Sequence, residues 1–258
     1  MAAPASRTRG TRALRIIQSE DQVERAPLVS PGTSGYILLL AEVDRRPPWL
    51  PASRNKRSVL TSAKEHSRAL LRNPLVRGAT VFRAALIPPG RGALLERRPF
   101  VHTAHFDVVV LIEVNAIDSL ARVEADEAFR ALEGELRGRS RLMHEVRAFN
   151  ARSMGPVDHS RKGVFLFNYF YADDREQNLA VWEYTAGWFH RETGLDNSTL
   201  LVPLDPAQVD YTVINHCRWD HYHDVLPSLL LKRSFRRFVL ASFEANDTAA
   251  MPILYRLA

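Results

Sequence analysis

Runs of apolar residues alternate with amphipathic segments along most of the chain, and this pattern predicts alternating strands and helices. The run 36–44, which follows Gly35, is typical of a buried strand. A helix is expected over about 56–71, because Asn73-Pro74 cannot continue it. The other segments expected before residue 150 are strands at 76–87, 106–114 and 142–149, a helix at 116–136, and a Gly/Arg/Pro loop that runs to Pro99.

The second part of the chain repeats this order of elements. Asp173-Asp174 with Glu176-Gln177 has the spacing of a capping box, and Gly194 is a natural end for the helix that follows. A second helical region is expected over 221–243, and Pro227 predicts a break within it, with a longer helix from about Ser228. The strands expected around these helices are 164–171, 199–203, 211–219 and 252–257.

Each half therefore follows the order β-α-β-β-α-β, which is the split unit of ferredoxin-like folds. An antiparallel sheet with helices on one face must bury its other face, and a second copy is a suitable partner. We predict an α+β protein of two tandem ferredoxin-like units, 35–155 and 156–258, packed sheet to sheet within one chain as an intramolecular α/β barrel. Residues 1–34 are expected to form a disordered or extended N-terminal arm.

The N-terminal arm has four arginines among its first 15 residues, and no acidic residue occurs before Glu20. No apolar core follows the basic start, so a secretory signal is not expected. The composition suits either an organellar transit peptide or a solvated tail, and we expect a solvated tail on a cytoplasmic protein. No apolar run approaches the roughly 20 residues of a membrane-spanning helix, so no membrane partner is expected.

Charge and cysteine content exclude several classes of function. The net charge is +6, but 31 of the 35 basic residues are Arg, and no zinc-finger spacing or RNP-like motif accompanies them. Nucleic acid is therefore not an expected partner. A single cysteine, Cys217, excludes an intramolecular disulfide and any multi-cysteine metal site, and we interpret it as a small apolar residue.

Three residues of the second half carry a resemblance to a known family. Asn168 lies on the first strand of that half, and Asn215-x-x-x-Trp219 lies on its third strand, with an amphipathic aromatic helix between them. Over about 163–258 the chain resembles the antibiotic-biosynthesis monooxygenase (ABM) domains of the dimeric α/β-barrel superfamily. The first half shares only the topology.

The resemblance implies oxygenation of a small aromatic or polyketide-like substrate by O₂, without a metal, flavin or other cofactor. An electron-rich phenolate or enolate can itself reduce O₂, so the protein must exclude water and stabilise an oxyanion with fixed donors. The resemblance assigns the catalytic roles to Asn168, Asn215 and Trp219. We expect the substrate to be bound by further residues, namely Trp182, Tyr211 and Arg236.

The same residues also have structural interpretations. Trp219 suits a core aromatic residue at a strand end, and the two asparagines could bond to backbone instead of lining a cavity. In the first half Leu39, Val110 and Val114 occupy the matching positions, so we expect one site per chain.

Two alternative functions stay open. A haem- or metal-binding relative would use histidines, but His216 and His221-x-His223 share no obvious face, and 236–243 contains no histidine for a haem. A non-catalytic small-molecule-binding or assembly module would have side chains filling the space beside Asn215. The protein is expected to be either a monomeric pseudo-dimer or a homodimer.

Overall fold

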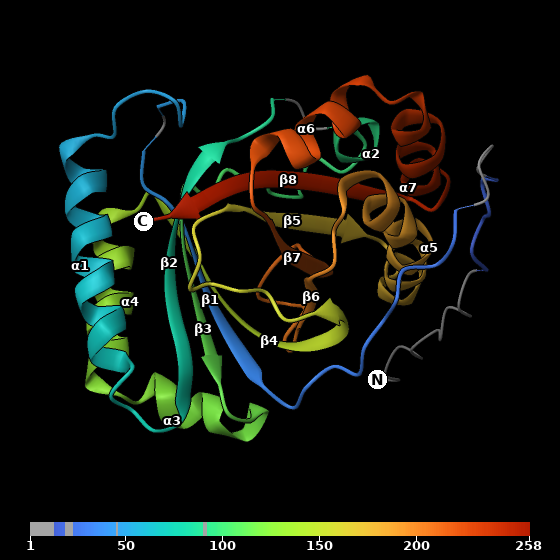
Figure 1. The fold of residues 1–258 in the computed structure, drawn as a ribbon. Helices are drawn as coiled ribbons and strands as arrows, with labels where there is room; N and C mark the ends of the chain where they lie inside the picture. Colours follow the sequence, from blue (N-terminus) through green and yellow to red (C-terminus); the bar gives the residue numbers. More distant parts are fainter. Residues whose placement is uncertain (1–12, 19–22, 45, 90–91) are drawn as a thin grey trace, which may run out of the picture.

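The computed structural model describes residues 13–18, 23–44, 46–89 and 92–258, and it has an α+β architecture. Eight antiparallel strands close into a barrel, and the helices lie outside it in two groups (Figure 1). None of the described helices is both long enough and apolar enough to cross a membrane.

The elements of the first half follow the expected order, with additional short helices. They are β1 (Gly35–Glu42), α1 (Arg54–Leu70), β2 (Val76–Leu86), α2 (Gly92–Glu96), β3 (Val108–Val114), the 3₁₀ turn η1 (Ile117–Ser119), α3 (Leu120–Glu124), α4 (Glu127–Arg139) and β4 (Leu142–Gly155).

The second half repeats the order of strands and main helices. Its elements are β5 (Val164–Ala172), α5 (Arg175–Thr193), β6 (Ser198–Pro203), β7 (Val213–Trp219), α6 (Tyr222–Leu231), the π-helical segment η2 (Phe235–Leu240), α7 (Ala241–Ala245) and β8 (Thr248–Leu257).

The strand order around the barrel is the same in both halves. The first half runs β4-β1-β3-β2 and the second runs β8-β5-β7-β6. Backbone pairing of β2 with β8 and of β4 with β6 joins the two halves at both edges. The halves therefore face each other across the interior and are hydrogen-bonded into one closed barrel, and the expected barrel is confirmed.

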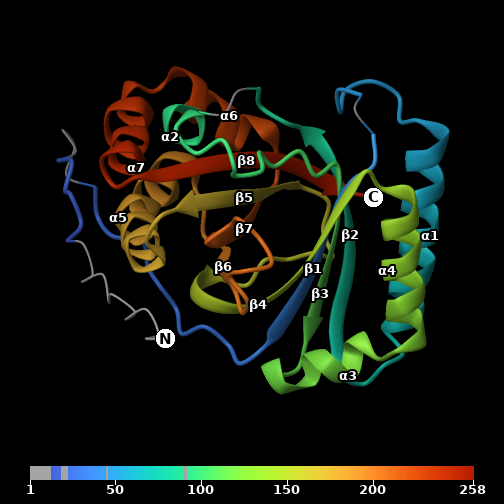
Figure 2. The ribbon, with the colours of Figure 1, turned by 180° about the vertical axis from the view of Figure 1, so that it is seen from behind.

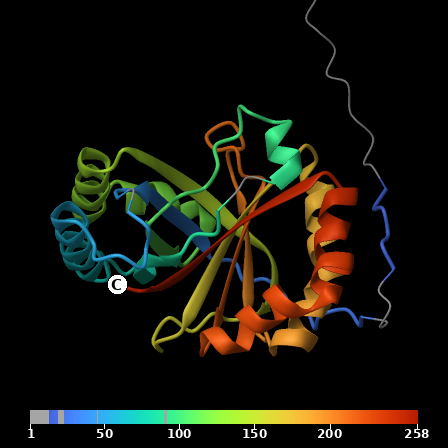
Figure 3. The ribbon, with the colours of Figure 1, turned by 90° about the horizontal axis from the view of Figure 1, so that it is seen from above.

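Helices cover two opposite sides of the barrel. α1 and α4 lie outside the strands of the first half, whereas α5, α6 and α7 lie outside those of the second (Figures 2 and 3). Because side chains alternate along a strand, each strand sends every second residue inward and the others toward a helical layer.

The barrel interior is filled largely by aromatic side chains. Phe82, Phe165 and Phe167 are fully buried there. The Tyr255 hydroxyl donates to the carbonyl of Phe106 at 2.7 Å, and the hydroxyl oxygens of Tyr169 and Tyr255 are 3.0 Å apart. The interior is therefore a packed core whose phenol groups have partners.

The helix predicted to start at Asp174 and end near Gly194 is confirmed. The Asp174 carboxylate accepts hydrogen bonds from the backbone N–H groups of Glu176 and Gln177, at 2.9 and 3.2 Å. Gly194 has a left-handed conformation with φ of 65°. Local chemistry thus sets both ends of α5.

The break predicted at Pro227 is wrong. Pro227 lies inside α6, and the helix ends at Leu231, before η2. In a regular helix the backbone N–H of residue 227 would donate to the carbonyl of His223, in the first turn of α6. Proline has no N–H, so this one helical hydrogen bond is lost. The helix is interrupted instead at Lys232, whose backbone is extended with ψ of 124°, and the π-helical segment η2 follows this break.

Other elements also differ from the prediction in their bounds. The helix expected at 116–136 is divided into η1, α3 and α4, and α2 lies in the expected loop. Strand β4 continues six residues past Phe149, because residues 148–155 pair with β6. Strand β8 starts before Pro252, which is tolerated because the pairing of β8 with β2 reaches only to Leu254.

The described part of the N-terminal arm lies along α5. Asn246 exchanges hydrogen bonds with the backbone of Arg15 at 2.8 and 2.9 Å, and the Tyr184 hydroxyl donates to the carbonyl of Ile17. Ala26 is buried in the apolar cluster beneath α5. Residues 1–12, with three of the four arginines, lie outside the described residues.

Replacement of Gly187 by Ala tests this docking of the arm. A Cβ at Gly187 would lie 1.7 Å from the carbonyl oxygen of Glu24, so the arm must shift. We expect Gly187→Ala to expose the arm and to accelerate limited trypsin cleavage at Arg25. In Gly134→Ala the Cβ meets no described atom within 4 Å, so that control should gain up to about 1 kcal/mol of helix stability. Equal cleavage of both variants and of the wild type would contradict the docking.

Stability should fall as the pH is lowered from about 6.5 toward 4. Burial lowers the pKa of His159 from 6.5 to about 4, so in this window the unfolded chain binds a proton that the folded chain does not. The neutral His159 ring contributes its full share to the free energy of unfolding above pH 6.5, the pKa in the unfolded chain. This contribution is lost as the pH falls from there toward about 4, the pKa in the folded chain. Urea unfolding at several pH values should show a smaller loss for His159→Gln than for the wild type; parallel curves would contradict this assignment.

Candidate functional site

A small cavity lies between the second-half strands and their helices, and four of the six predicted site residues line it. Asn168, Asn215, Trp219 and Trp182 contribute to its wall, together with Phe243 of α7. The cavity volume is about 20 Å³. A single water needs roughly 10–15 Å³ by the same measure, so the cavity holds one molecule of that size.

The strand register brings the two predicted asparagines together. Asn168 on β5 lies directly opposite Asn215 on the neighbouring strand β7. Asn168 is 9% exposed and Asn215 is 6% exposed, so both amides are largely removed from water. The expectation that these residues approach one another is confirmed.

Asn215 is held in one orientation by its neighbour on β6. The Ser198 hydroxyl donates to Asn215 Oδ1 at 2.6 Å, whereas Nδ2 has only the Cys217 sulfur at 4.0 Å. Since sulfur is a weak acceptor, the amide N–H groups are nearly unused. No pattern in the sequence indicates Ser198, because its contact with Asn215 depends on pairing between strands.

Asn168 has no hydrogen-bond partner for its side chain among the described residues. Its Oδ1 is buried and unpaired. Its other cross-strand neighbour, Pro252 on β8, has no N–H to offer. A buried polar group without a partner costs free energy, so this oxygen requires an explanation such as a bound water, an ion or a functional role.

Trp219 lines the cavity, but its indole N–H is already used. Nε1 donates to Thr193 Oγ1 at 3.1 Å, and this hydroxyl donates to the carbonyl of Phe189. In this arrangement Trp219 is therefore an apolar wall and not the predicted donor to a bound molecule. The proximity of Thr193 to Trp219 depends on how α5 ends, which the sequence pattern does not indicate.

Tyr211 and Arg236 lie away from this cavity. Tyr211 precedes β7, so it does not share the helix-facing side of Asn215 but lies in the barrel interior, its hydroxyl donating to the carbonyl of His102. Arg236 is exposed on η2. The strand alternation assumed for Tyr211 fails because the strand begins two residues later.

The cavity has no charged lining among the described residues. Cys217 is its one titratable group in this part of the chain, and burial raises the pKa of that thiol, so it is neutral at pH 7. The cavity therefore offers unused amide donors in an apolar, low-dielectric setting, where such donors interact strongly with an oxyanion.

The first half has no comparable polar set. Leu39 lies opposite Val110, as Asn168 lies opposite Asn215, and Val114 corresponds to Trp219. All three are buried in the apolar cluster beneath α1 and α4. The positions of the first half that match Asn168, Asn215 and Trp219 therefore carry no polar side chain.

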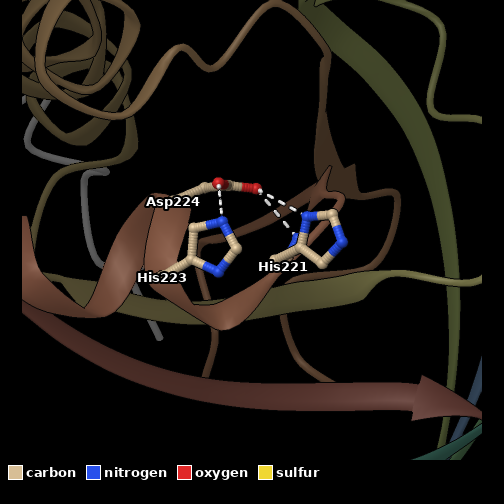
Figure 4. Close-up of side chains that lie close together, drawn as sticks. All are labelled: His221, His223 and Asp224. Atoms are coloured by element: carbon tan, nitrogen blue, oxygen red, sulfur yellow. Dashed lines mark hydrogen bonds and ion pairs between the residues drawn. The ribbon is translucent and has the colours of Figure 1, made fainter.

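A separate His-His-Asp group lies at the start of α6, at the protein surface. The rings of His221 and His223 are stacked, and a ligand atom from each and from Asp224 lies within 4.8 Å of the others (Figure 4). The expectation that the two histidines diverge is wrong, because His221 is the extended N-cap and not a helical residue. The Asp224 carboxylate also accepts the His221 backbone N–H at 2.8 Å, completing the cap.

Comparison with solved structures shows that other proteins share the fold of this chain. No protein-family model and no curated protein matches the chain. An anthrone oxidase-like protein superposes with a TM-score of 0.61 at 11% identity, covering 90% of this chain and 94% of that one. A candidate monooxygenase from Fusobacterium nucleatum has a TM-score of 0.56 at 6% identity, covering 88% and 93%.

Replacement of Asn168 by Leu should not destabilise the protein. It removes an unpaired buried acceptor and leaves no partner behind, so we expect unchanged or higher stability, by up to about 1 kcal/mol. Asn215→Leu should cost about 1–3 kcal/mol, because the Ser198 hydroxyl loses its acceptor. Urea unfolding of both variants measures the contrast, and a large loss for Asn168→Leu would show an unrecognised partner.

Proposed function

We propose that the two halves are tandem copies of the ferredoxin-like unit. The identical strand order and the equivalent pairs Leu39–Val110 and Asn168–Asn215 support this duplication. The closed barrel leaves none of its eight strands with a free edge, which favours the monomeric pseudo-dimer over a homodimer formed by edge pairing. One copy keeps an apolar core and the other keeps the polar cavity.

We propose that the protein is a cofactor-independent monooxygenase that acts on an aromatic or polyketide-like molecule. The observation that carries this proposal is that Asn168 and Asn215 face each other in an uncharged cavity and that their side-chain N–H groups have no strong acceptor among the described residues. In such a reaction a phenolate or enolate reduces O₂ directly. An activated ring CH₂ and O₂ then give a ring carbonyl and water, so the substrate supplies all the electrons.

The amides would stabilise the developing oxyanion. Neutral N–H donors fixed by Ser198, as at Asn215, need no reorganisation when negative charge appears. The apolar walls, including Trp182 and Trp219, exclude water from a reactive intermediate. The anthrone oxidase-like and monooxygenase-like neighbours share this fold over most of the chain, which adds support.

The size of the cavity imposes a condition on this proposal. A cavity of roughly 150 Å³ is known to bind benzene, whereas this one has about 20 Å³. It admits a molecule the size of water or dioxygen. An aromatic ring can enter only if the layer of helices outside the second-half strands, here called the helical cover (α5, α6, η2 and α7), moves away from them. The cover contains the π-helical segment η2 and the break after Leu231, and π-helical turns occur frequently at functional sites.

The small volume is also the observation that favours a non-catalytic module as the second candidate. If the helical cover never opens, the asparagines line a hydrated pocket in the core and bind no substrate. A haem-dependent relative receives less support, because none of the described lining residues of this cavity is a histidine.

Oxygen uptake with anthrone as the probe tests the proposal. Asn168→Leu and Asn215→Leu should each lower kcat/KM by roughly 100-fold, because each removes an oxyanion donor. Trp219→Phe should change it much less, since its N–H is already bonded to Thr193. Asn55→Ala, on the exposed face of α1, is the matched control.

The result for Asn168→Leu separates function from folding. A variant that is as stable as the wild type yet inactive places Asn168 in the reaction. Wild-type protein that consumes no oxygen with anthrone or a naphthol, or full activity in both asparagine variants, would overturn the oxygenase proposal and leave the non-catalytic module.

A further inference from the structure

A second, larger cavity lies at a mouth of the barrel, on the side of the sheet opposite to the asparagine pair. Its volume is about 260 Å³, and its walls come from β1, β3, β4, β6, β7 and the segment before β1. That segment closes over it, with the Val29 backbone N–H donating to the carbonyl of Ser153 at 2.8 Å. Both halves of the chain contribute, so the cavity exists only once the barrel has closed.

Two histidines form a hydrogen-bonded relay at the wall of this cavity. His159, in the loop before β5, and His216 of β7 approach each other with their Nε2 atoms 2.8 Å apart. His216 Nδ1 lies 3.0 Å from the carbonyl oxygen of Leu166. Because a carbonyl oxygen can only accept, Nδ1 of His216 carries a proton.

The protonation of the whole relay follows from this bond. Burial lowers the pKa of His216 well below its ordinary value, so the ring is neutral and its Nε2 accepts. His159 must then donate through Nε2. Burial also lowers the pKa of His159 to about 4, which leaves its Nδ1 unprotonated at neutral pH. This atom is an acceptor with no protein donor among the described residues.

Aromatic packing holds the relay in place. The His216 ring is stacked on Phe167, with centroids 4.0 Å apart, and the His159 ring contacts the edge of Phe82. The orientation of both imidazoles is therefore set by the barrel core and needs no ligand. A preformed polar group in a concave site is a common feature of small-molecule binding.

Other polar groups of the cavity complement a hydroxyl group. The buried Oδ1 of Asn150 has no partner among the described residues. Burial and the nearby Glu113 carboxylate raise the pKa of Tyr36 to about 12, so its phenol stays protonated and can donate. The cavity thus offers two acceptors without protein donors and one phenol. The charged lining residues Arg77 and Glu113 form an ion pair at 3.9 Å, and each is also hydrogen-bonded to the Ser34 hydroxyl.

The remaining walls suit a ring. Leu111, Val157 and Leu201 supply apolar surface beside the polar groups. The volume of about 260 Å³ exceeds the roughly 150 Å³ that suffices for benzene, in contrast to the helix-side cavity. A monocyclic molecule fits here without movement of the helices.

We propose that the barrel mouth binds a small ring that carries a hydroxyl group, with this group donating to His159 Nδ1 and the ring packed on Leu111 and Leu201. A second hydroxyl would reach the unpaired oxygen of Asn150. The site is independent of the proposed oxygenase activity, because it lies on the opposite face of the sheet and shares no residue with the helix-side cavity.

Titration calorimetry with phenol, cyclohexanol and toluene tests this site. Phenol and cyclohexanol should bind about tenfold more tightly than toluene, since only they can donate to His159. In His159→Phe the ring can still pack against Phe82, but no acceptor stands in place of Nδ1, so phenol should bind no better than toluene. Asn150→Leu should weaken the binding of catechol more than that of phenol.

Two controls keep the outcome interpretable. His66→Gln, on the outer helix α1, should bind all three probes like the wild type. Asn168→Leu should also leave phenol binding unchanged, which separates this site from the helix-side cavity. Equal affinities of the wild type for phenol and toluene, or a His159→Phe variant that folds and still prefers phenol, would overturn the proposal. Loss of phenol binding in Asn168→Leu would move the site to the other cavity.

Discussion

The hydrogen-bonded closure of the barrel is the constraint on which the other features depend. Pairing of β2 with β8 and of β4 with β6 turns two four-stranded sheets into one sheet without a free edge. A closed sheet has an inner and an outer face, and each strand residue must belong to one of them. The chain therefore has two separate apolar environments beside the second-half strands, and each contains a polar cavity.

Strand alternation assigns neighbouring residues of β7 to different cavities. Asn215 faces the helical layer, where it meets Asn168 and Ser198. His216, the next residue, faces inward and meets His159. A shift of one residue in register would exchange these two environments and bury the wrong groups in each. The aromatic core around His216 and the apolar cluster beneath α5 both oppose such a shift.

The two cavities differ in what they can do. The helix-side cavity is small and uncharged, and its amides are suited to stabilise negative charge once the helical cover has opened. The barrel-mouth cavity is larger and preformed, and the relay that ends at His159 gives it an acceptor for a hydroxyl proton. The unpaired oxygen of Asn150 gains a donor when the proposed ring with a hydroxyl group binds, whereas Asn168 would face an oxyanion with its N–H groups and not with its unpaired oxygen.

Much of the architecture could be predicted from local pattern. The order of strands and helices follows from hydrophobic period, and both ends of α5 follow from Asp174 and Gly194. The proximity of Asn168 and Asn215 follows from the order of strands within one ferredoxin-like unit. Errors had two causes. Tertiary pairing with β6 extends β4, whereas Pro227 is tolerated inside α6 because it lies close to the start of the helix and costs one hydrogen bond.

The amino-acid sequence by itself determined the α+β class, the repeated element order and the identity of the polar strand residues, because these depend on periodicity and residue type. Only the tertiary structure decided which donors are free. Thr193 occupies the Trp219 indole and Ser198 holds Asn215 through contacts between segments distant along the chain. It also revealed the His159–His216 relay, because a loop residue and a strand residue that are 57 positions apart in the second half meet only through its tertiary packing.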